Sequence, residues 1–303
     1  MIEYLVLSGG GPYGFIIYGC LKNLNKLKYW ELDNIKGIYG TSIGGIIGAV
    51  MCLNIEWDIL DNYFLNRPWD KAFNNELDNY FLYLINNNGI DGIKFINVIM
   101  EPLLSSKNIS INVTLRELFN ITNIELYLYA TNINHKNGMK NIELSYKSYP
   151  NMKLIDALAC TSGFPLIFKP IFYENMCLLD GGIMNGFPLK NCIENNKIDN
   201  INNILGIKLK IIKNNNLHDD NFGNFMDYIN LLIKKSHECI DNTYDNNYNV
   251  KNIITCYVDL KKLNIETSIW IESLNSSNKL KNKLINIGIE YSNRFLLFNK
   301  DLF

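Results

Sequence analysis

The chain has 303 residues, a formal net charge of −1 and a hydrophobic content of 48%. A charge so near zero provides no basic surface, and no sequence module that reads or stacks bases is present, so we expect no nucleic-acid partner. The apolar content is sufficient for a large buried core. Because no proline-rich or Ser/Gly-rich linker divides the chain, we predict one domain over residues 1–303.

The seven cysteines are odd in number and include no C-x-x-C pair. This pattern predicts buried thiols in a reducing compartment, with no metal site and no other cofactor. The N-terminal segment lacks a basic region, carries Glu3 and is interrupted by glycines, so we expect no signal peptide. Residues 37–55 carry no charge, but the G-x-S-x-G within them favours a buried strand and helix over a membrane span. We therefore expect a cytoplasmic protein that contacts membranes only peripherally.

Strand-like and helix-like segments alternate along the chain, which is typical of an α/β fold. The predicted strands are Tyr4–Leu7, Ile35–Tyr39, Ile124–Thr131, Met176–Leu179, Ile204–Ile212 and Ile253–Leu260. The clearest predicted helices are Phe15–Leu27, Ile43–Leu53, Lys153–Cys160, Phe225–Ile240 and Lys279–Phe298. An aromatic-rich stretch from Trp57 to Glu101 is interpreted mainly as core, with part of it a candidate acyl-chain groove or lipid-contacting cap.

A glycine cluster follows the first strand, with glycines at positions 9, 10, 11 and 14. Consecutive glycines let backbone N–H groups converge, so the loop can bind a phosphate or the oxyanion of an acyl intermediate. The spacing also satisfies the dinucleotide fingerprint G-x-G-x-x-G. That alternative requires an acidic residue at the end of the second strand, where this chain instead has Tyr39-Gly40-Thr41-Ser42.

The second strand ends in Gly40-Thr41-Ser42-Ile43-Gly44, a G-x-S-x-G directly before a predicted helix. A strand that turns at once into a helix holds the corner serine at strained backbone angles, and the glycines prevent strand and helix from colliding. The hydroxyl then lies at a helix N-terminus, where the dipole favours a developing alkoxide. The motif predicts Ser42 as a nucleophile, with an ordinary tight turn as the alternative.

Asp180-Gly181-Gly182 follows the apolar run Met176–Leu179. A carboxylate at a strand end is well placed to be a base, although Asp-Gly is also a common turn sequence. The three histidines, at positions 135, 218 and 237, all lie in polar sequence. Because a serine nucleophile needs a base, these surroundings favour Asp180.

These three elements, in this order, resemble the patatin-like phospholipases, lipid acyl hydrolases that use a Ser-Asp dyad. The resemblance includes the segment Cys160–Pro170, and Asn185 and Pro188 also match the family pattern. It covers about residues 4–190, and residues 191–303 would complete the same domain. One residue departs from the family pattern: Tyr13 stands where the family usually has Arg or Lys just before the last glycine of the first loop.

The resemblance implies a three-layer α/β/α fold with a mostly parallel central sheet, and hydrolysis of a lipid or other acyl ester. Ser42 would attack the ester, Asp180 would take its proton, and N–H groups of Gly10 and Gly11, helped by Gly9, would stabilise the oxyanion. The remaining motif glycines would support these loops: Gly14, Gly40, Gly44, Gly181 and Gly182.

Three alternatives stay open at this point. An α/β-hydrolase would use Ser42, Asp180 and either His218 or His237, although Ser42 follows the second strand, which is early for that fold. A non-catalytic lipid-binding or storage protein could retain the same fold. An acyltransferase is also compatible, because an alcohol can compete with water for an acyl-enzyme.

Overall fold

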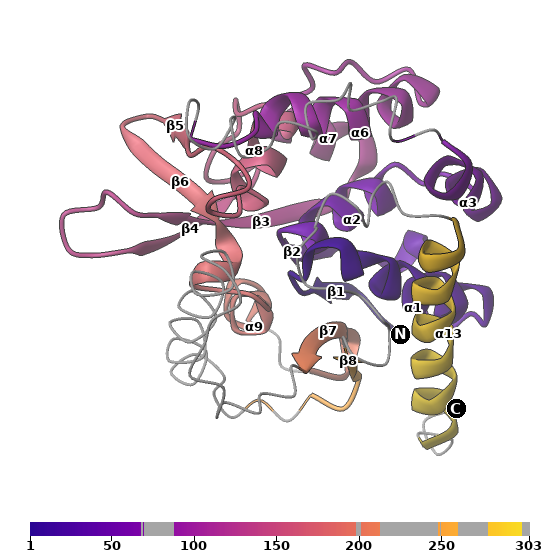
Figure 1. Cartoon of the computed structure of the whole chain (residues 1–303). Helices are drawn as coiled ribbons and strands as arrows, with labels where there is room; N and C mark the ends of the chain where they lie inside the picture. The colour runs from indigo at the N-terminus through magenta and orange to yellow at the C-terminus, as the bar shows by residue number, and fades with distance from the viewer. Residues whose placement is uncertain are drawn as a thin grey trace, which may run out of the picture.

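The computed structural model describes residues 1–67, 69, 88–197, 201–212, 248, 250–259 and 278–298. Its strands form one sheet (Figure 1). The strands are β1 (Tyr4–Leu7), β2 (Gly37–Thr41), β3 (Glu125–Asn132), β4 (Lys140–Leu144), β5 (Ile171–Tyr173), β6 (Met176–Asp180), β7 (Ile204–Ile212) and β8 (Ile253–Asp259).

Helices connect the strands and surround the sheet. The α-helices are α1 (Gly14–Lys26), α2 (Ile43–Cys52), α3 (Trp57–Asn66), α6 (Gly92–Ser106), α7 (Leu115–Thr122), α8 (Leu154–Thr161), α9 (Leu189–Asn196) and α13 (Asn278–Phe298). Short 3-10 helices are η1 (Gly11–Tyr13), η2 (Leu32–Asn34), η3 (Gly181–Ile183) and η4 (Ile201–Asn203). Within the described residues, no helix is both long and apolar enough to cross a bilayer.

The sheet is parallel through its centre and antiparallel at one side. Its order is β5-β6-β3-β2-β1-β7-β8, and β4 pairs with β3 off this path. Strands β3, β2, β1, β7 and β8 are mutually parallel, whereas β4 and β6 run antiparallel to β3, and β5 runs antiparallel to β6. The carboxyl ends of β1 and β2 therefore lie at the same edge, where ligands bind in open α/β sheets.

Side chains alternate between the two faces of the sheet, as a strand requires. On β3, Leu126, Leu128 and Ala130 join the larger core, which α1, α2 and α8 cover, whereas Tyr127 and Tyr129 join a smaller core beside α9. Helices thus cover both faces (Figure 1), and the predicted α/β/α fold class is confirmed. Helix α13 packs along α1 at one side of the molecule.

The predicted strands all form, two of them with the predicted bounds, Tyr4–Leu7 and Ile204–Ile212. The uncharged stretch 37–55 forms β2 and α2. Strands β4 and β5 are not among the sequence predictions; each pairs with the strand adjacent to it along the chain, β4 with β3 and β5 with β6. The predicted helix 225–240 and the aromatics Phe73, Tyr80, Phe81 and Tyr83 lie outside the described residues.

Candidate active site

Ser42 stands at the corner between β2 and α2. Its backbone angles, φ 55° and ψ −127°, are strained for a residue with a side chain. The corner closes only because its neighbours are glycines. A Cβ at Gly40 would lie 2.6 Å from the Gly45 backbone, and a Cβ at Gly44 would collide with the carbonyl oxygens of Leu7 and Ser8. The sequence motif therefore forms the tight corner that its spacing predicts.

Asp180 ends β6 beside this corner. The Ser42 hydroxyl donates a hydrogen bond to Asp180 Oδ2 at 2.7 Å, across 138 residues of sequence. Both side chains are buried, with 4% and 3% exposure. The second carboxylate oxygen, Oδ1, accepts the N–H of Gly182 at 2.7 Å. Gly181 has no room for a side chain, because its Cβ would strike the Tyr129 carbonyl on β3. The two glycines thus place the carboxylate against both the sheet and the serine.

Burial raises the pKa of Asp180 to about 6, while the hydrogen bonds from Ser42 and Gly182 oppose this rise. The carboxylate is therefore a stronger base than a solvent-exposed aspartate, yet most molecules are ionised at neutral pH. A buried carboxylate with a hydroxyl as its hydrogen-bond donor is a chemically suited general base.

The first glycine loop lies directly above Ser42. A Cβ added at Gly9 would be 3.4 Å from Ser42 Cβ. The N–H of Gly9 donates to the Gly186 carbonyl at 2.9 Å, so this structure does not offer it to a substrate, contrary to the expected helping role. Among the described residues, no acceptor is bonded to the N–H of Gly10 or Gly11. Both adopt positive φ, 152° and 55°, a region that favours glycine.

Two threonine hydroxyls, which no sequence motif indicated, connect the corner to β3 and to the loop after η3. The N–H of Ser42 donates to Thr161 Oγ1 at 3.0 Å, and Thr161 Oγ1 donates to the Tyr129 carbonyl at 2.6 Å. Thr41 Oγ1 donates to the Asn185 carbonyl at 2.8 Å. Thr161 lies in the segment that resembles the family pattern, but nothing in that pattern indicates its partner. Its contacts arise from tertiary packing.

Gly14 begins α1, and a Cβ there would collide with the Ile43 side chain, so the first loop packs directly on α2. Tyr13 is partly buried against the core, and burial raises the pKa of its hydroxyl. His135 lies in the loop between β3 and β4, where its Nδ1 accepts the N–H of Asn137. His218 and His237 lie outside the described residues.

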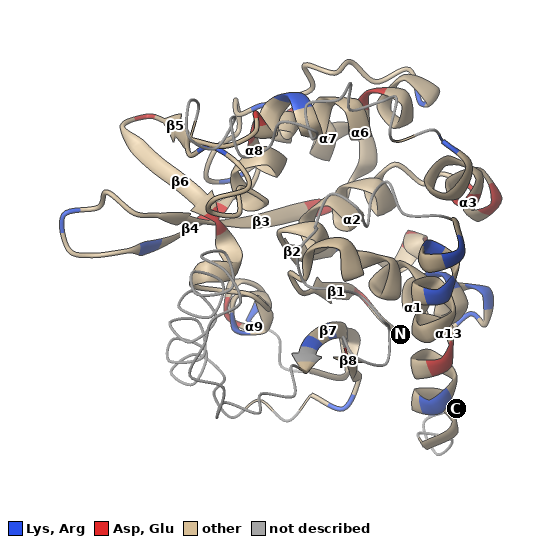
Figure 2. Ribbon diagram, viewed as in Figure 1, with Lys and Arg blue, Asp and Glu red and all other residues tan. Residues whose placement is uncertain are grey.

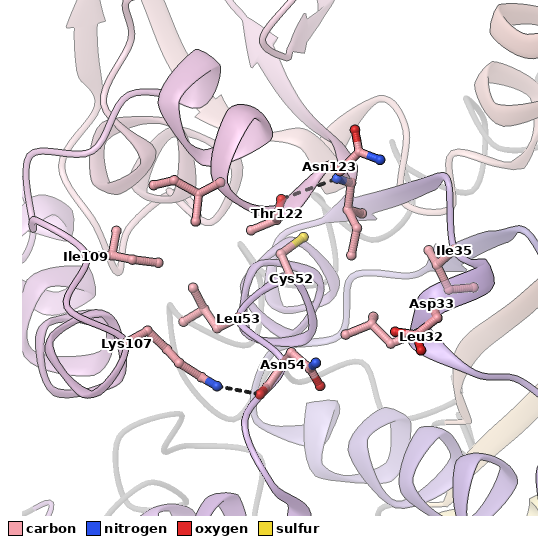
Figure 3. Close-up of a pocket in the computed structure, with 12 residues that line it drawn as sticks. Leu32, Asp33, Ile35, Cys52, Leu53, Asn54, Lys107, Ile109, Thr122 and Asn123 are labelled. Atoms are coloured by element: carbon pink, nitrogen blue, oxygen red, sulfur yellow. Dashed lines mark hydrogen bonds between the residues drawn. The ribbon is translucent and has the colours of Figure 1, made fainter.

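A cavity of about 460 Å³ lies at the opposite edge of the sheet (Figure 3). It is lined by residues that precede β2 and β3, such as Ile35 and Ile124, and by Cys52 and Leu53 near the end of α2. Lys107 reaches across one side and donates to the Asn54 carbonyl. None of the sequence-predicted site residues lines this cavity.

Comparisons with known proteins agree with the fold and the motifs. A family model for patatin-like phospholipases matches residues 5–193. A probable lipid hydrolase of Invertebrate iridescent virus 6, 463L, is 31% identical over 186 residues, 61% of each chain. The uncharacterized protein R571 of Acanthamoeba polyphaga mimivirus is 27% identical over 237 residues, 75% of this chain and 73% of that protein.

Among solved structures, VipD from Legionella pneumophila has a similar fold. The TM-score is 0.57 at 13% identity, and the likeness covers 97% of this chain and 66% of VipD. At this identity the likeness supports the fold alone. The matched part of this chain thus spans slightly less than two thirds of the lengths of 463L and VipD.

Proposed function

The chain belongs to the patatin-like phospholipase family, and from this membership we propose that it is a lipid acyl hydrolase acting through Ser42 and Asp180. The observation that carries the proposal is the 2.7 Å hydrogen bond from the Ser42 hydroxyl to the buried Asp180 carboxylate. A serine on a strained corner, with a base already bonded to its hydroxyl, is arranged for nucleophilic attack.

In the acylation step, Asp180 takes the Ser42 proton as Oγ forms a bond to the ester carbonyl carbon. The carbonyl oxygen becomes an oxyanion, which the N–H groups of Gly10 and Gly11 stabilise. When the tetrahedral intermediate collapses, the bond to the leaving alcohol oxygen breaks and that oxygen receives the proton from Asp180. The products of this step are the free alcohol and an acyl ester on Ser42.

In the deacylation step, Asp180 serves as base a second time. It takes a proton from water as the water oxygen attacks the acyl carbon, and the same N–H groups stabilise the second oxyanion. Collapse breaks the bond to Ser42 Oγ, which recovers its proton from Asp180. A fatty acid is released and the enzyme returns to its starting state.

The environment of the dyad compensates for the weakness of a carboxylate as a base. Burial raises the pKa of Asp180 to about 6, closer to the working pH than that of a solvated aspartate. The N-terminus of α2 and the two N–H donors supply positive potential where negative charge develops. Preorganised donors of this kind cost no reorganisation during the reaction.

A lipid panel with product identification tests the proposal. Purified protein is incubated with phospholipids and acylglycerols, with and without an alcohol acceptor, and the products are identified by mass spectrometry. We expect free fatty acid from the wild type and none from Ser42→Ala. Ester products formed with the alcohol would instead indicate an acyltransferase, and no turnover of any ester would favour a lipid-binding protein.

Covalent labelling locates the nucleophile independently of the lipid chosen. A fluorophosphonate should modify the wild type at Ser42, and peptide mapping should find the adduct there. The matched control is Ser162→Ala, because Ser162 is also buried close to the dyad but donates to the Leu158 carbonyl. Labelling that survives in Ser42→Ala would contradict the assignment of the nucleophile.

A further inference from the structure

An unusual row of apolar side chains crosses the antiparallel part of the sheet. Phe172 on β5 is 75% exposed, and Ile133 and Met139, in the loop between β3 and β4, are 41% and 47% exposed. The buried Cys177 on β6 lies between Phe172 and Ile133. Exposed apolar side chains that lie in one row indicate an interaction surface more strongly than scattered ones.

Strand register puts the row on one face and at one level. Phe172 pairs with Cys177, and the N–H of Ile133 donates to the Cys177 carbonyl at 3.0 Å. Met139 precedes Lys140, the partner of Asn132, so it stands opposite Ile133. Direct partners in antiparallel strands project to the same face. With neighbouring strands about 4.8 Å apart, the row spans about 14 Å.

The row lies at the catalytic edge of the sheet. Ala130 on β3 pairs with Asp180, and Ile133 is three residues further along the same strand direction. At about 3.3 Å per residue, the row lies about 10 Å beyond the carboxylate, on the side where β3 leaves the sheet. Figure 1 shows the two hairpins, β3–β4 and β5–β6, projecting together at this side of the molecule.

The two hairpins are joined to each other by Asn134. Its side-chain nitrogen donates to the Asn175 carbonyl at 3.0 Å, and its side-chain oxygen accepts the Cys177 N–H at 2.9 Å. Glu174 and Asn175 both adopt positive φ, which closes the β5–β6 turn tightly. The row is therefore presented by connected strands, and little conformational entropy is lost when it binds a partner.

A basic residue lies beside the row. Lys136 lies in the turn of the projecting β3–β4 hairpin, between Ile133 and Met139, whereas Lys140 follows Met139 on β4 and therefore projects to the opposite face of the sheet. Figure 2 shows blue segments on this hairpin, and Glu174 is the acidic residue of the neighbouring turn. Neither lysine forms an ion pair with any described residue. Their charges are therefore available to an anionic partner.

We propose that Phe172, Ile133 and Met139, with Lys136, form the surface on which this protein docks to anionic lipid bilayers. The inference rests on the proposed lipid hydrolase function. A few apolar side chains beside a lysine match an interfacial membrane contact, in which apolar groups enter the headgroup boundary and cations meet anionic headgroups. A row about 14 Å long is small compared with the surface that a stable protein interface buries, which favours a bilayer over a protein partner.

Docking in this way would bring substrate to the dyad. Interfacial side chains enter about 5–10 Å into the headgroup region, a depth similar to the separation of about 10 Å along β3 between the row and Asp180. The dyad would then lie close to the level of the lipid headgroups and carbonyls. A lipid would need to move only a short way out of the bilayer to reach Ser42.

Vesicle co-sedimentation tests the surface without hydrolysis of the vesicles. All proteins carry Ser42→Ala, and the vesicles are phosphatidylcholine with or without phosphatidylserine. The triple variant Phe172→Thr, Ile133→Thr, Met139→Gln should bind vesicles at least about tenfold more weakly, since interfacial binding scales with buried apolar area. The control is Ile121→Thr, because Ile121 is 57% exposed but lines the cavity at the opposite edge.

The lysines are tested in the same assay. Lys136→Gln should weaken binding to phosphatidylserine vesicles about fivefold, from about 1 kcal/mol per cation, and should leave binding to pure phosphatidylcholine unchanged. Lys140→Gln should weaken it less, because that side chain projects to the opposite face of the sheet. Circular dichroism checks the fold of each variant. Equal binding by the triple variant and Ile121→Thr would overturn the proposal, as would a parent protein that binds neither vesicle.

A parallel assay separates failure of the surface from failure of the proposed function. The same surface substitutions are placed in the protein with Ser42 intact, and turnover of a soluble p-nitrophenyl ester is measured. Turnover should match the wild type, while hydrolysis of vesicle lipid should fall with binding. Normal soluble-ester turnover without any vesicle binding would reject the docking surface alone, whereas no turnover of either substrate would reject the hydrolase function.

Discussion

The two ends of the parallel strands differ in what they offer a substrate. At the carboxyl ends of β1 and β2, the hydroxyl of the strained Ser42 donates a hydrogen bond to the buried carboxylate of Asp180. The N–H groups of Gly10 and Gly11, which bond no acceptor among the described residues, lie in the adjacent loop. At the amino ends there is a cavity of about 460 Å³, but its potential nucleophile, Cys52, is a buried thiol whose pKa burial raises to about 12. The volume of a cavity alone does not make it an active site, because nucleophilic catalysis requires a nucleophile with a base hydrogen-bonded to it.

The largest expected effect comes from Asp180→Asn. An amide cannot take the Ser42 proton, so kcat on a soluble ester should fall by about 10²- to 10⁴-fold. Steady-state kinetics measures the loss. The controls are His135→Ala, His218→Ala and His237→Ala, each of which should retain activity within a few-fold. A histidine variant as inactive as Asp180→Asn would indicate a Ser-His-Asp triad in place of the dyad.

The next effect comes from the glycine loop. Gly10 has a φ of 152°, and its Cβ would lie 2.5 Å from Leu209 Cδ1, so Gly10→Val should distort the loop. Loss of one oxyanion donor should raise the barrier by about 2.7–4 kcal/mol, seen mainly in kcat. Tyr13→Arg is the comparison. Its kcat on a neutral ester should lie within a few-fold of the wild-type value. If it falls to the Gly10→Val level, Tyr13 helps to build the loop.

The pKa of Asp180 predicts opposite trends for activity and stability. Activity should rise as the carboxylate ionises through about pH 6. Because the folded pKa lies above the unfolded value of 3.8, the stabilisation from protonated Asp180 is complete below pH 3.8 and is lost as pH rises through about 6. Relative to wild type, Asp180→Asn should therefore gain up to about 3 kcal/mol in free energy of unfolding at pH 8. Urea unfolding at pH 4 and pH 8 checks this, and an equal difference at both would contradict it.

A smaller effect is expected at Thr161, which positions the corner. Thr161→Val keeps the shape but leaves the Ser42 N–H and the Tyr129 carbonyl without their partner. Because misplacement of a nucleophile is costly, kcat should fall about 10- to 100-fold with little change in KM for a short ester. Thr161→Ser keeps the hydroxyl and should restore kcat. A failure of serine to restore it would mean that packing of the methyl group matters more than the hydrogen bonds.

The smallest effects should come from the cavity. Asp33 and Lys107 line it on the exposed side, and Asp33→Ala and Lys107→Ala should leave ester turnover within about twofold, because surface substitutions away from the reacting groups change little. The same soluble-ester assay measures them. A loss of turnover as large as that expected for Thr161→Val would contradict the contrast between the two edges of the sheet and would indicate that the cavity takes part in the function.

Much of this site could be predicted from sequence because its strain is local. Gly40 and Gly44 are required by a strand that turns directly into a helix, and glycine is favoured where the backbone adopts positive φ, as at Gly10 and Gly11. These requirements act over a few residues, so their spacing is visible in the chain. The same locality made most strands and helices predictable, since each follows its own apolar period.

The sequence by itself determined the corner serine, the glycine loop, the Asp-Gly-Gly and six of the strands. Only the tertiary structure decided three hydrogen bonds. The Ser42 hydroxyl donates to Asp180, the Ser42 N–H donates to the Thr161 hydroxyl, and the Gly9 N–H donates to the Gly186 carbonyl. The contact between Ser42 and Asp180 depends above all on β6 running antiparallel beside β3, and the other two depend on where α8 and the loop after η3 pack. Register is set by which side chains the whole core buries, and no single segment encodes it.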